Sequence, residues 1–248
     1  KALACALATE VNEASAKLVA YRPDRFGAFG HIPLPDVDGA LRELEYLSDT
    51  LHMDGVVLMA SIGGQFLGDN AFDPVYAELD RRRTVVFIHP TIHPSTKQVE
   101  IDLPEFMMEF MFDTTRAVAN LVFSGTLERY PNIRFIIAHA GAAIPYLAER
   151  MSLGKLIDAR LAERIPQDPV VYLKRLYYDT ALSASPTPID SSMVPTRLRR
   201  TSLLATSVPS KCLVIPPSPT PVCTFVIRTI AQPRRECSTL RGYQVQGG

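Results

Sequence analysis

Short apolar runs rich in β-branched and aromatic residues recur along most of the chain and predict buried strands. They lie at residues 25–29, 55–60, 84–88, 133–138 and 176–179. Apolar side chains at successive positions over such lengths are typical of strands covered on both faces, as in a parallel sheet.

The segments between these strands have helical periodicity. Leu41, Leu44 and Leu47 follow Asp36, a candidate N-cap, at spacings of three, and a broad apolar face after Pro104 predicts a second helix that ends at Tyr130. Alternating strands and helices predict either an open doubly wound sheet or a barrel. Neither GxGxxG nor GxxxxGK[ST] occurs, so we favour the α/β fold of a (β/α)8 TIM barrel of the metal-dependent hydrolase type, incomplete at both ends.

Composition divides the chain near residue 186. Residues 1–185 hold 18 basic and 24 acidic residues, whereas residues 186–248 hold 8 basic and 2 acidic residues together with 9 of the 20 prolines. We therefore expect a partial barrel over residues 1–185 and an irregular Pro/Ser/Arg-rich tail over residues 186–248. The overall charge of zero predicts no nucleic-acid or membrane-surface partner, and no apolar run is long enough to span a membrane.

Three of the predicted strands run directly into a reactive side chain. His89 and His139 follow the third and fourth strands, and Asp179 ends the fifth. The C-terminal strand ends of a βα barrel converge on the active site, where two imidazoles and a carboxylate can bind a divalent metal or exchange protons. The alternatives are structural: a histidine after a strand is often a satisfied core residue, and a strand-terminal aspartate often caps the next turn.

The remaining polar candidates have simpler interpretations. We expect a turn role for His31, a helix-end role for His52 and a loop position near the pocket for His93. The run 81–83 (Arg-Arg-Arg) closes a helix and is expected to be solvated. The four cysteines form no CxxC, and their scarcity before residue 186 agrees with a reducing cytoplasm.

Four strings of residues resemble the amidohydrolase-related decarboxylases, a family that includes the aminocarboxymuconate-semialdehyde decarboxylase group. They are RPDRFGAFGHIPLPDVDGALRELEYL, VVFIHPT, FDTTRAVANLVFSGTLERYPNIRFIIAHAG and YYDTALS. The third is most similar to the fungal 6-methylsalicylate decarboxylase branch. The resemblance covers residues 8–185 and implies a metal-dependent barrel that removes carbon dioxide from an aromatic hydroxy acid.

The resemblance also implies roles for individual residues. His89 matches the metal-binding histidine at the end of a middle strand, and His139 matches the histidine of an HAGG motif that assists proton transfer; Asp179 is a further catalytic candidate. The implied cofactor is a divalent metal, zinc first and manganese second, without an organic cofactor. The family's early HxH or ExH and its late GSD[YF]P-like motif do not occur here, and Ala142 replaces the second glycine of HAGG.

The sequence is therefore compatible with two functions from different classes. One is decarboxylation of a small aromatic carboxylic acid in the cytoplasm, by a chain that self-associates as a homodimer. The other is a catalytically inactive partial barrel; hydrolysis of a lactone or amide on the same scaffold is a third reading. Metal content and carbon dioxide release distinguish the first two.

Overall fold

The computed structural model describes residues 1–98, 102–179, 181, 211–214 and 225–229. Seven strands form one sheet, in the order β7-β6-β5-β2-β1-β9-β8. The five strands β1, β2, β5, β6 and β7 are parallel and neighbour one another in chain order. Their bounds are β1 Phe26–His31, β2 Gly55–Met59, β5 Val85–His89, β6 Arg134–Ile137 and β7 Tyr177–Tyr178. The predicted α/β fold and all five predicted strands are confirmed, with shifts of one or two residues at most of their ends.

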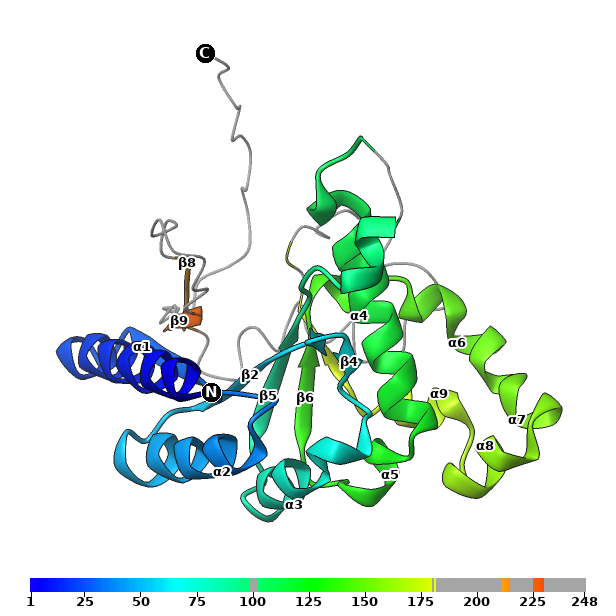
Figure 1. Ribbon diagram of the computed structural model, residues 1–248, viewed down its shortest axis with the longest axis horizontal. Helices are drawn as coiled ribbons and strands as arrows, with labels where there is room; N and C mark the ends of the chain where they lie inside the picture. The colour runs from blue at the N-terminus through cyan, green and yellow to red at the C-terminus, as the bar shows by residue number, and fades with distance from the viewer. Residues whose placement is uncertain (99–101, 180, 182–210, 215–224, 230–248) are drawn as a thin grey trace, which may run out of the picture.

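Helices follow the parallel strands around the sheet, with α1 and α2 at the β1 end and α6 to α9 at the β7 end (Figure 1). The α-helices are α1 Ala2–Tyr21, α2 Val37–Glu45, α3 Asp73–Arg81, α4 Glu105–Phe123, α5 Thr126–Arg129, α6 Ile144–Ser152, α7 Gly154–Ile157, α8 Ala159–Arg164 and α9 Pro169–Leu173. Shorter helical turns are η1 Tyr46–Thr50, η2 Asn70–Phe72, η3 Pro94–Gln98 and η4 His139–Gly141. The helix predicted after Asp36 is α2, but it continues as the π-helical turn η1. No helix among the described residues is both long and apolar enough to cross a bilayer.

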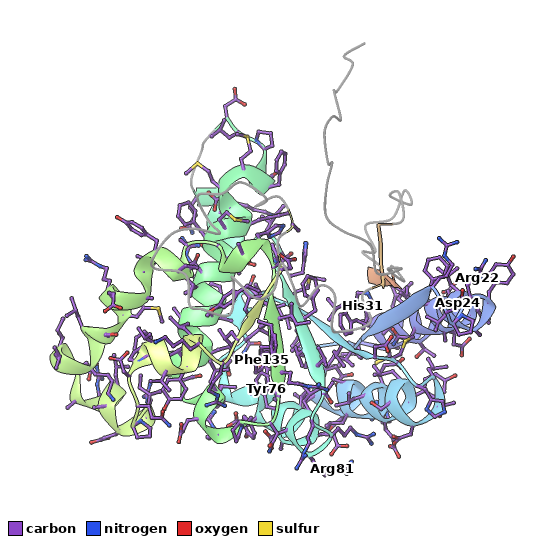
Figure 2. The ribbon with its side chains drawn as sticks, turned by 180° about the vertical axis from the view of Figure 1, so that it is seen from behind. Arg22, Asp24, His31, Tyr76, Arg81 and Phe135 are labelled. Atoms are coloured by element: carbon purple, nitrogen blue, oxygen red, sulfur yellow. The ribbon has the colours of Figure 1, made fainter. Side chains whose placement is uncertain are left out.

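The core lies between the sheet and its helices. Val56, Val86 and Ile137 from three neighbouring strands are fully buried. Tyr76 of α3 packs edge-on against Phe135 of β6, with ring centroids 6.4 Å apart (Figure 2). Burial on both faces accounts for the continuous apolar sequence of β2, whereas fully buried and less buried residues alternate along β5 and β6.

A small hairpin projects after β2 and was not predicted as such. Its strands are β3 Ser61–Ile62 and β4 Gln65–Phe66, and they pair antiparallel. The connecting residues Gly63 and Gly64 have φ values of +59° and +88°. Two residues with positive φ give the turn whose twist matches a hairpin, so the Gly63-Gly64 pair sets this element.

The tail contains two strands that the sequence reading did not predict. β8 (Lys211–Val214) pairs antiparallel with β9 (Phe225–Thr229), and β9 pairs antiparallel with β1. The expectation of an irregular tail is therefore wrong for these two segments, because their short apolar and β-branched runs have strand propensity that the surrounding prolines obscured. The rest of the predicted tail, and the boundary near residue 186, lie outside the described residues.

Candidate active site at the carboxyl ends of the strands

The sheet register brings the three predicted site residues to one edge. Met59 of β2 pairs with His89, the last residue of β5, and Ile137, which ends β6, pairs with Tyr178 of β7. His139 and Asp179 therefore follow neighbouring strands at the same level. The imidazole rings of His89 and His139 have centroids 5.6 Å apart. The predicted convergence of these side chains is present in the structure, whereas their chemical roles stay predictions.

The His89 imidazole is held in one orientation. Its Nδ1 lies 2.8 Å from the carbonyl oxygen of Pro90, which can only accept, so Nδ1 carries the proton and the acceptor lone pair is on Nε2. The rings of Phe87 and Phe110 flank it, each with a centroid 6.2 Å away. Burial lowers the pKa of His89, the Pro90 contact raises it and the nearby His139 lowers it further. The neutral ring is therefore favoured.

The His139 side chain is 7% exposed and lies on a left-handed turn. Its Nδ1 is buried and has no hydrogen-bond partner within the described part of the chain. Burial lowers the pKa of His139, and the charge of Asp179 opposes that shift. A buried imidazole nitrogen without a partner is unusual in a folded protein, because an unmade hydrogen bond costs free energy. This nitrogen is therefore a point where a ligand or water would bind.

Asp179 binds the backbone of this turn. Its Oδ1 accepts hydrogen bonds from the backbone N–H of His139 at 2.6 Å and of Ala181 at 3.2 Å, and its carbonyl oxygen accepts from Ala140 N–H at 3.2 Å. Burial raises the pKa of the Asp179 carboxyl, while these bonds and His139 lower it. The contacts thus fix the position of His139 relative to β7; a catalytic role for Asp179 stays a prediction.

The turn after β6 has an unusual backbone. Four successive residues, His139 to Ala142, have φ values between +54° and +80°. Gly141 is required by space as well, since a Cβ there would lie 2.6 Å from the Tyr178 ring. Ala142 has φ 54° and ψ −125°, a region that essentially only glycine adopts without strain. Backbone strain is thus concentrated beside a site residue.

The other three histidines take different positions. The backbone of His31 is held by Asn12 of α1, whose side chain donates to the His31 carbonyl and accepts from its N–H, each at 2.8 Å. His31 also lines a cavity of about 140 Å³ with Met59 and Ser61, adjacent to the His89 strand. We expected His31 to lie in a turn, but it is the last residue of β1 and lies beside this cavity. Figure 2 shows its position.

The His93 side chain contacts the β3–β4 hairpin rather than the imidazoles of His89 and His139. Its ring stacks on Phe66 with centroids 4.7 Å apart, and its Nε2 lies 3.2 Å from the carbonyl oxygen of Gly64. Its Nδ1 contacts Ser95, accepting from that residue's backbone N–H. The structure thus gives His93 a role in joining the loop after β5 to β3 and β4.

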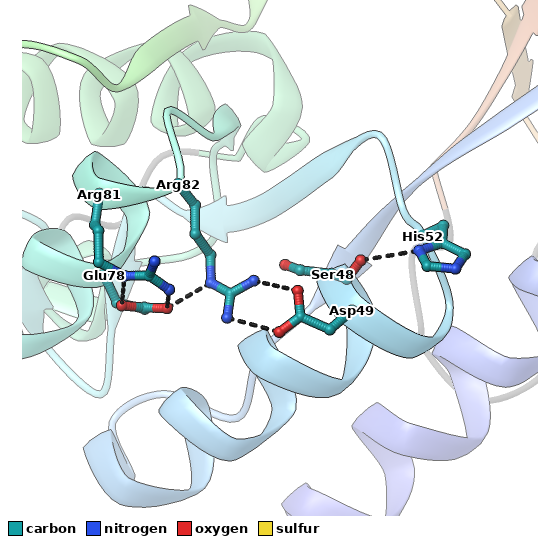
Figure 3. A network of polar contacts seen from close by, with 6 residues as sticks. All are labelled: Ser48, Asp49, His52, Glu78, Arg81 and Arg82. Atoms are coloured by element: carbon teal, nitrogen blue, oxygen red, sulfur yellow. Dashed lines mark hydrogen bonds and ion pairs between the residues drawn. The ribbon is translucent and has the colours of Figure 1, made fainter.

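His52 lies at a helix end, as predicted, whereas the expectation of a solvated arginine run is wrong for Arg82, whose side chain is only 17% exposed. His52 contacts the carbonyl of Ser48 at the end of a helical turn, and Arg82 bridges Asp49 and Glu78 (Figure 3). Arg81 pairs with Glu78 as well. Hydrogen bonds from the two arginines lower the pKa of Glu78 to about 2 against the opposing effect of burial.

Sequence reasoning missed Asp113. This aspartate lies in the middle of α4, is 1% exposed, and accepts a hydrogen bond from the backbone N–H of Thr91. A signal was present in the sequence, because Asp113 falls between Phe110 and Ala117 at spacings of three and four, on the apolar face of the helix. A carboxylate at a core position indicates a specific partner.

The described residues do not by themselves fit a catalytic metal. Within the parts of the chain that the structure places, no three His, Cys, Asp or Glu side chains are arranged to hold an ion. His89 offers one nitrogen and His139 a second, while the Oδ1 of Asp179 is bound to backbone N–H groups. A catalytic zinc site ordinarily needs about three protein ligands.

Comparison with known proteins places this arrangement in a family. The amidohydrolase family model matches residues 1–182. The 6-methylsalicylic acid decarboxylase of Penicillium expansum is 37% identical over 186 residues, which cover 74% of this chain and 57% of the relative. Decarboxylase yanB of Aspergillus niger is 37% identical over 188 residues, covering 72% and 51%. A 2-amino-3-carboxymuconate-6-semialdehyde decarboxylase of Dictyostelium discoideum is 25% identical over 180 residues, covering 70% and 49%. The chain thus spans about half of these relatives' length.

Solved structures agree on the fold. An amidohydrolase II crystal structure is 26% identical with a TM-score of 0.65 and covers 84% of this chain and 72% of its own. A 2,6-dihydroxybenzoate decarboxylase, solved with 2,6-dihydroxybenzoate, is 24% identical with a TM-score of 0.62, covering 71% and 58%. A 5-carboxyvanillate decarboxylase of Novosphingobium aromaticivorans, solved with manganese, is 22% identical with a TM-score of 0.67, covering 77% and 58%. These likenesses confirm the predicted TIM-barrel class.

Proposed function

This chain belongs to the amidohydrolase family, and from that premise we propose that it carries the strand-end site of a decarboxylase acting on a hydroxylated aromatic acid such as 6-methylsalicylate. The observation that carries the proposal is the pair of imidazoles at neighbouring strand ends, the half-buried His89 and the buried His139, with ring centroids 5.6 Å apart. The 37% identity to a 6-methylsalicylic acid decarboxylase supports the substrate class.

The proposed reaction needs a proton donor at one ring carbon. Loss of carbon dioxide breaks the bond between that carbon and the carboxyl group and leaves the electron pair on the ring, so a proton must replace the departing group. His139 is our candidate for this transfer, because its Nδ1 is buried and has no partner within the described residues. A positioned acid or base of this kind contributes about 10²–10⁴-fold to a rate.

We propose that Asp179 supports this role through the backbone of the His139 turn, beside the catalytic role predicted for it. By accepting from the His139 N–H at 2.6 Å and from the following turn through its own carbonyl, it fixes the backbone from which the imidazole projects. The cavity beside His31 and Met59, about 140 Å³, adjoins the end of β5, because Met59 pairs with His89 in the sheet. We propose that the aromatic ring of the substrate approaches His89 from this side.

We propose that the reaction requires a divalent cation, a requirement that the assay with added zinc or manganese tests. When bound in such a site, a cation holds a carboxylate or a neighbouring hydroxyl and offsets negative charge. His89 is the ligand that we propose for it, zinc being our first expectation and manganese the metal of the solved 5-carboxyvanillate decarboxylase. The further ligands would have to come from outside the described residues, because those residues hold no group of three donors.

The test is release of carbon dioxide from carboxyl-¹³C 6-methylsalicylate by the purified full chain, with and without added zinc or manganese. We expect release that falls at least about 100-fold in His139→Ala. His52→Ala serves as the matched control, since it removes an imidazole whose contact is a helix-end carbonyl. Release that is equal in His139→Ala and in the control would contradict the assignment of His139.

The second candidate is a catalytically inactive chain, and the shortage of metal donors in the described residues favours it. This candidate predicts no carbon dioxide release with any added metal, whereas the aromatic acid can still bind beside His31. Titration calorimetry with 6-methylsalicylate, followed by the turnover assay on the same sample, separates the two. A cytoplasmic location and a homodimer belong to the proposal as well, and cell fractionation and light scattering test them.

A further inference from the structure

Asp113 is a buried carboxylate, and its position within α4 gives no reason for its burial. It lies in the third turn of α4, far from the helix start at Glu105, so it cannot cap that helix. Its Oδ2 accepts a hydrogen bond of 2.9 Å from the Thr91 N–H. Its Oδ1 is buried without a partner of good hydrogen-bond geometry in the described residues. Burial raises the pKa of the Asp113 carboxyl, and the contacts with the Thr91 N–H and the Ser61 hydroxyl oppose that shift. Burying such a group costs free energy, so it needs a reason.

The peptide that Asp113 binds is the one that holds His89. The N–H of Thr91 and the carbonyl of Pro90 belong to the same planar peptide unit, and in a trans peptide they point in opposite directions. Asp113 accepts from the N–H at 2.9 Å, and His89 Nδ1 contacts the carbonyl oxygen at 2.8 Å. The chain of contacts therefore runs from carboxylate to peptide to imidazole.

We propose that Asp113 is the positioning residue of His89, acting through the Pro90–Thr91 peptide. The carboxylate fixes the plane of this peptide, and the carbonyl on its far side then fixes both the orientation and the tautomer of the imidazole. Hydrogen bonds in series polarise one another, so a charged acceptor at one end strengthens the bond at the other. The effect on His89 is that of a carboxylate–histidine pair with one peptide unit inserted between its members.

The consequence concerns the nitrogen that His89 presents to a ligand. With Nδ1 donating to Pro90, the lone pair lies on Nε2, the nitrogen that a metal or a substrate hydroxyl would use. Neutral histidine in water favours the tautomer with the proton on Nε2. An Nδ1–H tautomer at His89 would therefore show that the Pro90 carbonyl determines where the proton lies. This inference rests on the proposed function only in taking His89 as a site residue.

The test is ¹⁵N NMR of the histidine side chains in the full chain without added metal, with His89 assigned from a His89→Ala sample. We expect the Nδ1–H tautomer in the wild type and in Asp113→Asn, whose amide oxygen still accepts from Thr91. In Asp113→Ala the His89 signals should move toward the Nε2–H tautomer. Thr114→Val is the matched control, because it removes a neighbouring buried hydroxyl that has no partner within the described residues.

An unchanged His89 tautomer in Asp113→Ala overturns the proposal, as does a loss in Asp113→Asn as large as in Asp113→Ala. If the Asp113→Ala variant does not fold, the Asp113→Asn spectrum is the test. Loss of the Nδ1–H tautomer of His89 in Asp113→Asn also overturns the proposal. Where the chain turns over, kcat should fall about 10–100-fold in Asp113→Ala and be restored in Asp113→Asn. The tautomer measurement needs no turnover, so a chain with the Nδ1–H tautomer but no carbon dioxide release would contradict the proposed function alone.

Discussion

Replacing Ala142 by glycine should stabilise the protein, although glycine ordinarily weakens a fold. Ala142 has φ 54° and ψ −125°, where a Cβ is in conflict with the backbone. Holding a non-glycine residue in such a region costs about 1–3 kcal/mol. The turn itself is kept by the hydrogen bond from Ala142 N–H to the His139 carbonyl at 2.9 Å, which the substitution does not touch.

The expected gain is smaller than the strain, because glycine also increases the entropy of the unfolded chain. That entropy costs about 0.4–1 kcal/mol, which leaves a net increase in the free energy of unfolding of about 0.5–2 kcal/mol. For a domain of this size the melting temperature should rise by about 1–8 °C. Urea unfolding followed by far-ultraviolet circular dichroism measures the free energy, and a thermal scan measures Tm.

Ala143→Gly is the matched control, since the neighbouring residue has φ −87° and ψ −1° and carries no such strain. We expect it to lose about 0.5–1 kcal/mol, the ordinary cost of glycine. The reasoning is refuted if Ala142→Gly destabilises the protein as much as Ala143→Gly does, because the backbone at Ala142 would then not be strained.

Two further predictions concern polar groups away from the turn. The pKa of Glu78 is lowered to about 2 by hydrogen bonds from Arg81 and Arg82. This pairing stabilises the fold at pH values above the unfolded-state pKa near 4.5, and the stability is lost as the pH falls toward 2. Because Arg81 is largely exposed, Glu78→Gln should cost only about 1–2 kcal/mol at pH 7 and nothing near pH 2; equal costs at both values in urea unfolding would show that charge is not the cause. Asn12→Ala should cost about 2–4 kcal/mol, because it removes two 2.8 Å hydrogen bonds to the partly buried backbone N–H and carbonyl of His31; a loss below about 1 kcal/mol would contradict that role.

The fold could be predicted from the sequence wherever burial imposes a simple pattern. Runs of successive apolar residues located the five parallel strands, although both faces are fully covered only along strands such as β1 and β2, and burial alternates along β5 and β6. The positions of His89 and His139 followed from the same pattern, since each comes at the end of such a strand. The convergence of strand ends in a barrel then predicted that the two rings would lie near each other.

Features that depend on contacts between distant segments could not be predicted. The strand β9 pairs with β1, almost 200 residues earlier in the chain, and nothing in the local sequence indicates that partner. The left-handed run from His139 to Ala142 is fixed by Asp179, 40 residues away, although alanine has no preference for it. Asp113 was detectable as a charge on an apolar helix face, but its partner, the Thr91 N–H, required the structure.

The proposed function requires His139 to protonate the ring carbon that loses carbon dioxide. The most direct measurement is turnover of 6-methylsalicylate in D₂O with zinc or manganese present, followed by mass spectrometry and NMR of the methylphenol product. We predict one deuterium at the ring carbon that carried the carboxyl group, formed by the wild type and by His52→Ala and lost in His139→Ala. Unchanged substrate in all samples, or deuterated product at the same rate in His139→Ala, would contradict the claim.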